Sequence, residues 1–369
     1  MKSLANTFFK NRLARLYVCV FIITVVSSIV HAQTVHVVDN NQGAGAQFTS
    51  LQNAIDAATE GDIVYVQPSP NSYGSINLTK SLTLYGAGHR PELNAGLSAK
   101  IADIYFTGNA SGTKLSGLQI NRIYLQYSSS NNDIVISNNR ISEIYGNSST
   151  SLANNVIITG NFFYTNVQSA IDVYNSQNWV VTHNLFQRES TYFDYQLFYR
   201  FNSSTIFNNN IILSPQIGNS GQVVRLFRDS YSTPINNCIF LFRGTNVQSI
   251  NTGDTVVYNN CLTYSLNSTI DALSGTNNID NQNPQFTNLD INGFLNSTGN
   301  DFTIQTGSPA KNAGTDGNDL GVENGGYPFT VRGYPTELPY ITEFTVYNNV
   351  VSPSTPLNVN IKANANITN

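Results

Sequence analysis

One phrase recurs six times between Ile134 and Leu262, and it restricts the fold more than any other feature of the sequence. The phrase has six positions. The first is Ile or Val, the third is Asn, Gly or His, the fourth is Asn, and the sixth is Ile, Leu or Phe, whereas the second and fifth positions vary. The phrase starts at Ile136, Ile158, Val181, Ile206, Pro234 and Val257, with Pro234 breaking the first position. The central Asn falls at 139, 161, 184, 209, 237 and 260, in steps of 22, 23, 25, 28 and 23 residues. A period in this range is typical of a solenoid with one repeat per coil.

The residues around each phrase indicate which solenoid the chain forms. Short β-branched runs such as Ile134–Ile136 and Val156–Ile158 precede the Asn and predict strands. The position before the central Asn holds residue types that tolerate a positive φ: Asn138, Gly160, His183, Asn208, Asn236 and Asn259. Stacked coils repeat every ~4.8 Å, so the Asn amides can bond from coil to coil as a ladder. We therefore predict a parallel β-helix, right-handed because strand crossovers almost always are.

The first 32 residues have the pattern of a secretory signal peptide. Basic residues precede an apolar run, Leu16–Val26, and Val30-His31-Ala32 fits a cleavage site. A retained membrane anchor is disfavoured because the run is short and no second apolar span follows. We expect a signal peptide at 1–32, a β-helix domain at 33–335 and a short C-terminal β tail or cap at 336–369. The mature protein is then secreted or held at the cell surface, without a membrane span.

The charge of the mature chain argues against nucleic acid as a partner. Removing the signal leaves 18 minus 4, or 14, Lys and Arg against 22 Asp and Glu, a net charge of −8. Bulk attraction to nucleic acid or to an anionic membrane is therefore not expected. We expect the chain to be a monomer.

Two cysteines, Cys238 and Cys261, occupy the same position of the repeat one coil apart. Stacking brings their backbones close enough for a disulfide in an oxidising compartment. Two stacked, free, apolar thiols are the alternative, because stacking fixes the distance but not the direction of the side chains.

Both ends of the solenoid carry a candidate cap. Leu51, Ala54, Ile55 and Ala58 have the spacing of an amphipathic helix opened by a Thr49–Gln52 capping box. Such a helix would cover the first coil and prevent edge pairing. At the other end, Ile341–Tyr347 and Leu357–Ile361 predict a β-hairpin docked on the end coil.

Two segments resemble the ends of a known superfamily. FTSLQNAIDAATEGDIVYVQP followed by INLTKSLTLYGAG resembles the opening of secreted bacterial right-handed β-helix proteins of the pectate-lyase-like superfamily. NPQFTN and DFTIQTGSPAKNAGTDGNDLG look like the closing coil of the same group. The resemblance implies the fold and leaves the activity open, because this superfamily includes lyases, hydrolases, epimerases and adhesins.

Candidate binding residues lie on a second strand of the middle coils. If Ile171, Phe198 and Val224 share one inward position, alternation places Asp172, Tyr199 and Arg225 in an outward column. The same coils add further charged candidates: Arg188, Arg200, Arg228 and Asp229. Aromatic residues crowd the region: Tyr192, Phe193, Tyr195, Phe198, Phe201, Phe227 and Tyr231.

A face rich in Arg and Tyr suits an acidic polysaccharide, because guanidinium groups pair with carboxylates and aromatic rings stack on sugars. The alternative is that the aromatic residues fill the core and the arginines decorate turns. This region therefore predicts either a binding face for an extracellular polysaccharide or a wide aromatic core.

Catalytic signals are weaker. A lyase that acts on uronate chains would need a base and an Arg or Ca²⁺ to neutralise the uronate. Arg225 with Asp172 or Asp229 is the pair that could fill these roles. His183 is better explained as a turn residue, and no metal-ligand spacing occurs. Three hypotheses remain: a polysaccharide-binding protein, a polysaccharide lyase, and a structural or adhesive surface protein.

Overall fold

The structure is a computed structural model of the 369-residue chain. It describes residues 33–93, 95–146, 150–165, 168–189, 196–214, 226–245, 249–250, 255–326, 329–347, 350 and 356–364. Residues 1–34 and 35–369 are separate compact units, and the second contains every element named below. The predicted signal peptide lies outside the described residues.

Two long sheets build the second unit. Among the described residues the first sheet has 11 strands, which lie in this order: β1 (Val35–Val38), β2 (Ile63–Val66), β4 (Thr83–Tyr85), β6 (Lys114–Ser116), β8 (Val135–Ser137), β10 (Ile157–Thr159), β13 (Val180–Thr182), β16 (Ile206–Asn208), β19 (Tyr231–Asn236), β21 (Thr255–Asn259) and β23 (Gly275–Thr276).

The second sheet has 12 strands within the described ranges and forks at β9. Its first four strands are β3 (Ile76–Lys80), β5 (Lys100–Asn109), β7 (Gln119–Tyr124) and β9 (Arg140–Tyr145). One branch continues as β11 (Phe162–Thr165), β14 (Leu185–Arg188), β17 (Ile211–Ser214), β20 (Ile239–Thr245) and β22 (Leu262–Asn267). The other continues as β12 (Ile171–Asp172), β15 (Phe198–Tyr199) and β18 (Phe227–Arg228).

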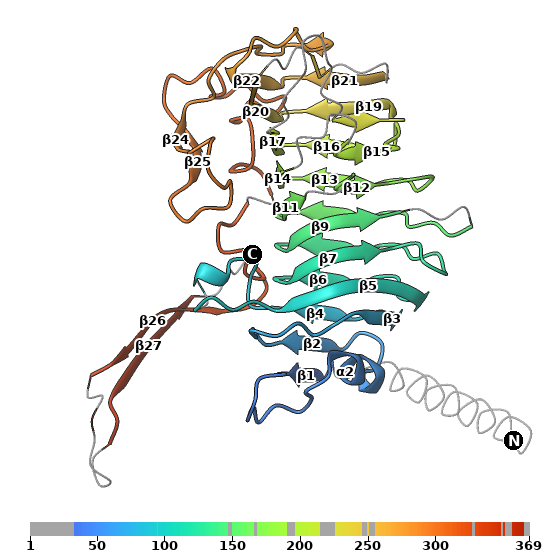
Figure 1. Cartoon of the computed structure of the whole chain (residues 1–369), viewed down its shortest axis with the longest axis vertical. Helices are drawn as coiled ribbons and strands as arrows, with labels where there is room; N and C mark the ends of the chain where they lie inside the picture. The colour runs from blue at the N-terminus through green and yellow to red at the C-terminus, as the bar shows by residue number, and fades with distance from the viewer. Residues whose placement is uncertain are drawn as a thin grey trace, which may run out of the picture. The chain divides into compact units, whose positions relative to one another are not determined.

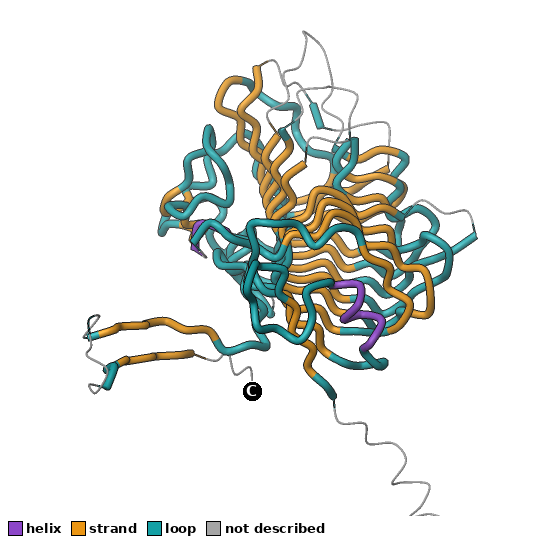
Figure 2. The backbone as a smooth tube through the Cα atoms, turned by 60° about the horizontal axis from the view of Figure 1, so that its bottom comes forward, coloured by secondary structure: helices purple, strands orange, loops and turns teal. Residues whose placement is uncertain are grey.

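Every pairing between consecutive coils in these sheets is parallel and nearly in register, and Figure 1 shows the strands stacked one above another. Equivalent residues therefore form columns. Ile136, Ile158, Val181, Phe207 and Ile235 face inward in one such column and are fully buried. This is the predicted parallel β-helix, and Figure 2 shows its coils lying over one another.

The Asn ladder forms as predicted in its first half. The backbone N–H of Leu118, Asn139 and Asn161 each donates to the side-chain oxygen of the Asn in the next coil, at 2.9 Å in all three cases. The residue before each ladder position turns the corner with a positive φ, 55° at Asn138 and 65° at Gly160.

The second half of the ladder lies one residue later than the sequence predicted. Asn184 N–H donates to Asn210 at 2.9 Å, and Asn210 N–H contacts the Cys238 sulfur at 3.4 Å. Asn209 is the corner residue, with a φ of 55°. The error arose because Phe207, and not Ile206, points into the core.

Cys238 and Cys261 are free, buried thiols in the ladder position, which is the arrangement given above as the alternative to a disulfide. Each thiol contacts a backbone carbonyl, Cys238 that of Asn236 at 3.2 Å and Cys261 that of Ile235 at 3.4 Å. Burial raises the pKa of Cys238, so the group is a neutral thiol that replaces the Asn amide.

The predicted N-terminal cap is present as α2 (Leu51–Ala57). Its Leu51, Ala54 and Ile55 are buried, and it contacts β1, β2 and β3 of the first coils. The capping residue is Ser50, whose side chain accepts from Asn53 N–H, and not Thr49.

The segment expected to form a closing coil folds differently. β24 (Phe286–Asn288) and β25 (Asp301–Ile304) pair with each other in antiparallel fashion. Their Phe286, Phe302 and Ile304 pack against outward-facing residues of the second sheet, among them Leu241 and Leu262. The upper part of that sheet is therefore covered on its outer side.

The return segment, residues 310–326 and 329–335, then runs back along the row of corners toward the first coils. Its contacts meet successively earlier coils: Ala313 O accepts from Asn260, Thr315 bonds Asn237, Asn324 O bonds His183, Thr330 Oγ1 bonds Asn138, and Pro335 packs on Gly117. A short 3-10 helix, η1 (Pro91–Leu93), lies in the loop that precedes β5.

The last element is an antiparallel hairpin of β26 (Tyr340–Val346) and β27 (Val359–Asn364), which Figure 2 shows running side by side. The hairpin was predicted, but not its environment. Phe344 is 61% exposed and Ile361 56% exposed, so the described residues of the hairpin are not docked on an end coil. In the described part of the chain, no helix is long and apolar enough to cross a membrane.

Candidate functional site

One outward position of the second sheet forms a column across six coils. In register these residues are Tyr105, Tyr124, Tyr145, Asp172, Tyr199 and Arg228, named here the tyrosine column. The sequence predicted Asp172 and Tyr199 in one column, and the structure confirms this. The third predicted member was wrong, because Phe227 pairs with Phe198 and so places Arg228 in the column. Arg225 and Val224 lie outside the described residues.

The first members of the column form an aromatic platform. The rings of Tyr105 and Tyr124 stack with centroids 4.8 Å apart and an interplanar angle of 7°. Tyr127, which is 59% exposed, meets the Tyr105 ring edge-on at 4.8 Å, and Tyr145 continues the row 5.7 Å from Tyr124. Three tyrosines on successive strands thus present aromatic surface that is not needed to fill the core.

Asp172, which is buried, and Arg200, which is partly exposed, form an ion pair in the middle of the column. Arg200 Nε donates to Asp172 Oδ1 at 2.9 Å, and its second nitrogen donates to Oδ2. The guanidinium lies 4.2 Å from the Tyr174 ring centroid and 4.4 Å from that of Tyr199. Asp172 was expected to face solvent, but it is 2% exposed because Arg200 covers it. Burial raises the pKa of Asp172, and the bonds from Arg200 oppose this shift.

A second carboxylate and arginine lie beside Asp172. Arg122 Nε is 3.2 Å from Glu143 Oε2, and Ser169 donates to Glu143 Oε1 at 3.4 Å. Glu143 is 6% exposed, and its burial raises the pKa of the carboxyl group, with the charge of Asp172 adding to the shift. Each of the two carboxylates thus has its own arginine, Glu143 with Arg122 and Asp172 with Arg200.

The remaining predicted residues are not in one site. Arg188 is fully buried on β14, and Phe198, Phe201 and Phe227 fill the core, as the alternative for the aromatic cluster proposed. Asp229 is exposed and contacts Tyr199. Tyr192, Phe193 and Tyr195 lie outside the described residues.

His183 is a corner residue, as the sequence indicated. Its φ is 55°, its Nδ1 lies 2.7 Å from Thr182 Oγ1, and its Nε2 bonds the Asn324 carbonyl of the return segment. Burial lowers the pKa of His183. Within the described residues, no three His, Cys, Asp or Glu side chains are grouped as a metal site.

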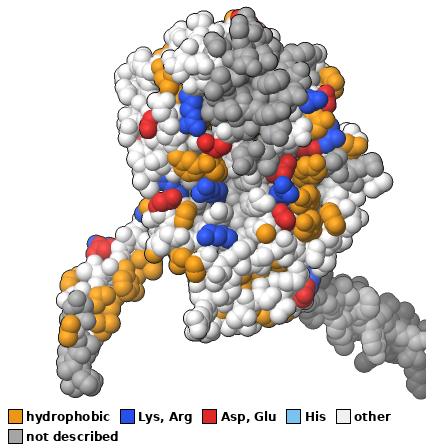
Figure 3. All heavy atoms as spheres, in the orientation of Figure 1, with side chains coloured by type: hydrophobic (Ala, Val, Ile, Leu, Met, Phe, Trp, Pro, Cys, Tyr) orange, Lys and Arg blue, Asp and Glu red, His pale blue; other side chains and the backbone are white. Residues whose placement is uncertain are grey.

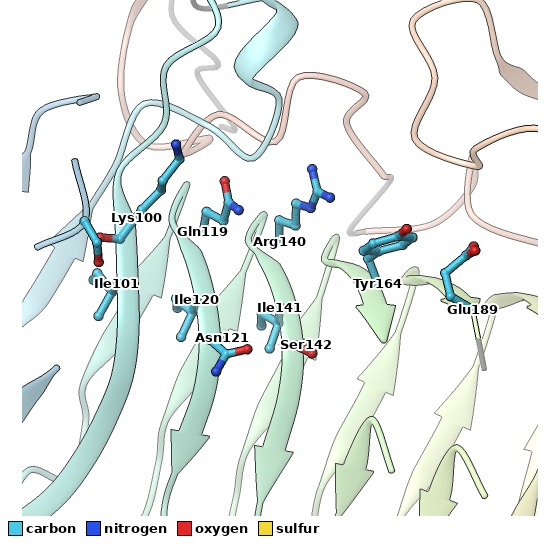
Figure 4. A pocket seen from close by; sticks show the side chains of 11 residues that line it. Lys100, Ile101, Gln119, Ile120, Asn121, Arg140, Ile141, Ser142, Tyr164 and Glu189 are labelled. Carbon is cyan, nitrogen blue, oxygen red and sulfur yellow. The ribbon is translucent and has the colours of Figure 1, made fainter. Parts of the chain in front are cut away.

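A groove of about 420 Å³ lies on the same sheet, nearer the Asn corner. Lys100, Gln119 and Arg140 occupy one register position on β5, β7 and β9. Figure 4 shows them projecting to the same side, whereas Ile101, Ile120 and Ile141 point the other way, into the core. The groove is completed by Asn121, Ser142, Tyr164, Glu189 and Ser72.

Sequence reasoning missed both the tyrosine platform and the groove, because both begin in coils that lack the Asn phrase. A signal was present. Tyr105, Tyr124 and Tyr145 each follow an isoleucine directly, and each is the fourth residue after another inward isoleucine, Ile101, Ile120 and Ile141. Aligning these coils on their isoleucine pairs would have placed the three tyrosines in one outward column.

The charged side chains of the visible face are mixed in sign. In Figure 3, basic side chains lie singly among acidic and apolar ones and form no large basic patch. Comparisons with known proteins do not narrow the function: no protein-family model matches the sequence, and no curated protein matches it.

Proposed function

We propose that this protein is exported and binds an extracellular polysaccharide along the tyrosine column. The observation that carries the proposal is the register of Tyr105, Tyr124 and Tyr145 on adjacent strands, with the stacked rings of the first two. A polymer lying across the strands meets one side chain per strand spacing, about every 4.8 Å. Aromatic faces stack on the apolar faces of sugar rings, and the hydroxyl groups of tyrosine supply hydrogen bonds at the edges.

The charges at the column favour recognition by stacking over recognition by charge. The Arg200 fork is already satisfied by Asp172, and Arg122 is paired with Glu143. Each guanidinium is therefore largely neutralised by its own carboxylate, which weakens its attraction for a uronate. Arg228, half-buried at the end of the column, is the arginine best placed to meet an acidic sugar.

Affinity gels that contain pectin, alginate, a glycosaminoglycan or a neutral glucan test the proposal. Tyr124→Ala should weaken retardation by the preferred polymer about three- to tenfold, because one aromatic contact contributes ~0.5–1.5 kcal/mol. Tyr347→Ala is the matched control, since Tyr347 is 68% exposed and lies outside the column. Equal retardation of the wild type and Tyr124→Ala, or no retardation in any gel, would contradict the proposal.

A polysaccharide lyase is the second candidate, favoured by the two buried carboxylates Glu143 and Asp172 beside the platform. Burial raises the pKa of both groups, and such groups are frequent at catalytic sites. Absorbance of unsaturated uronate, followed with and without Ca²⁺ on the same acidic polymers, tests it. The lyase would be established if the wild type and Tyr347→Ala form the product and Asp172→Asn does not. Retardation without product would leave binding alone.

A further inference from the structure

The groove beside the tyrosine column contains two cations, Lys100 and Arg140, that lack an ion-pair partner in the described part of the chain. Among the described residues, no carboxylate oxygen lies within 4.0 Å of the Lys100 or Arg140 nitrogens. Glu92 is close enough to favour the charged form of Arg140, but it does not form an ion pair with it. Glu189 also lines the groove, and its charge is compensated by Arg243 at 3.2 Å.

The uncharged residue between the two cations also presents donors. Ser98, which is fully buried, donates to the side-chain oxygen of Gln119 at 2.7 Å. Gln119 lines the groove, and no hydrogen bond within the described residues engages its amide NH₂ group. Lys100, Gln119 and Arg140 therefore form a row of donors on three successive strands.

Arg140 is held in place by three rings. Its guanidinium carbon lies 5.8 Å from the Phe162 ring centroid, 5.2 Å from that of Tyr164 and 5.3 Å from that of Phe294. Phe294 lies in the segment between β24 and β25. This segment therefore forms one side of the surroundings of the Arg140 guanidinium. Burial of Arg140 lowers its pKa, but it stays charged at neutral pH. A positioned, half-buried cation without a counterion is suited to bind an anion.

We propose that the groove binds an oxyanion, a sulfate or a carboxylate, carried by a sugar unit. The row of donors matches the acceptor oxygens of such a group, and Asn121, Ser142 and Tyr164 line the groove with polar atoms suited to sugar hydroxyls. The volume of about 420 Å³ is in the range of small-molecule sites. Only the identity of the carrier rests on the proposed polysaccharide function, because the affinity for an oxyanion follows from Lys100, Gln119 and Arg140.

The groove is distinct from the tyrosine column. On β7, Tyr124 of the column lies three positions after Asn121 of the groove, a run of roughly 10 Å. A polymer that lies on the column would therefore reach the groove with a side branch or a charged substituent.

Isothermal titration calorimetry of the full mature chain with inorganic sulfate, D-glucuronate and D-glucose at constant ionic strength tests the proposal. Sulfate, glucuronate or both should bind, and glucose should bind at least tenfold more weakly. Arg140→Gln and Lys100→Gln should each weaken oxyanion binding about tenfold, the usual effect of losing one charge-assisted hydrogen bond. Lys114→Gln is the matched control, because Lys114 is exposed on the first sheet and its substitution removes the same charge.

Lys100→Gln keeps the test decisive if Arg140→Gln disturbs its aromatic surroundings, since no described partner bonds the Lys100 ammonium group. Wild-type oxyanion affinity in Lys100→Gln, or binding of neither sulfate nor glucuronate more tightly than glucose, would overturn the proposal. Tyr124→Ala separates the two functions. If the column proposal alone fails, Tyr124→Ala leaves polymer retention unchanged while the groove variants still lose oxyanion binding.

Discussion

His89 should make the stability of the fold depend on pH through the return segment. The imidazole is fully buried, and Asn296 Nδ2 lies 3.0 Å from its Nδ1. Gly333 packs so closely on the ring that a Cβ there would lie 1.7 Å from the imidazole Cδ2. Burial, with the nearby charges of Arg90 and Arg140, lowers the pKa of His89 from 6.5 to about 3.

The sign of the effect follows from the depressed pKa. Above pH 6.5 the ring is neutral in both the folded and the unfolded state, so no stability is lost. Between pH 6.5 and about 3 only the unfolded state binds the proton, and stability falls as the pH falls. At pH 5 the loss attributable to His89 is about 2 kcal/mol, because each pKa unit corresponds to ~1.4 kcal/mol.

Urea unfolding at pH 7 and pH 5, followed by the fluorescence of the buried Trp179, measures this loss. The wild type should lose about 2 kcal/mol more than His89→Gln between the two pH values, because Gln cannot titrate. Measuring the loss between pH 7 and pH 5 within each protein removes the cost of the substitution. Subtracting the loss of His89→Gln from that of the wild type removes the contribution of the other titrating groups. A loss that is the same in both proteins to within about 0.5 kcal/mol would refute the reasoning.

Three further predictions concern the ladder, the thiols and the hairpin. Asn161→Ala should lower the free energy of unfolding by about 3–5 kcal/mol, because it orphans Asn139 N–H and two buried carbonyls, and chemical denaturation measures this. Cys238 and Cys261 should react with a thiol reagent only in denaturant, and a disulfide in the purified protein would contradict the free thiols. Phe344→Ser should change stability by less than ~0.5 kcal/mol, since the side chain is exposed; a larger loss in thermal unfolding would indicate hidden packing.

The fold was readable from the sequence because a solenoid repeats its own local rules. Asn139 and Asn161 lie where the phrase put them, since each follows one β-branched strand and one residue suited to a positive φ. The phrase at Ile206 misled the alignment because it offers three consecutive asparagines and two apolar residues. Only the burial of Phe207 determines which Asn enters the ladder.

The candidate site was less readable because it depends on contacts between distant coils. Pairing of Asp172 with Arg200 requires knowing that the two side chains bend toward one another across 28 residues. The same holds for Arg140, because its aromatic neighbour Phe294 lies between β24 and β25, in a segment that lacks the Asn phrase. Alternation predicts which side of a sheet a residue faces, but not which loop will cover it.

The return segment changes the order in which the chain can complete its structure during synthesis. Coils of an ordinary solenoid depend only on their neighbours and can be added as they are made. Here Thr315 bonds a residue 78 positions earlier, Asn324 one 141 positions earlier and Thr330 one 192 positions earlier. The first coils made are thus the last to receive this contact. The late, long-range closure should slow the final folding step and join the two ends of the solenoid into one cooperative unit.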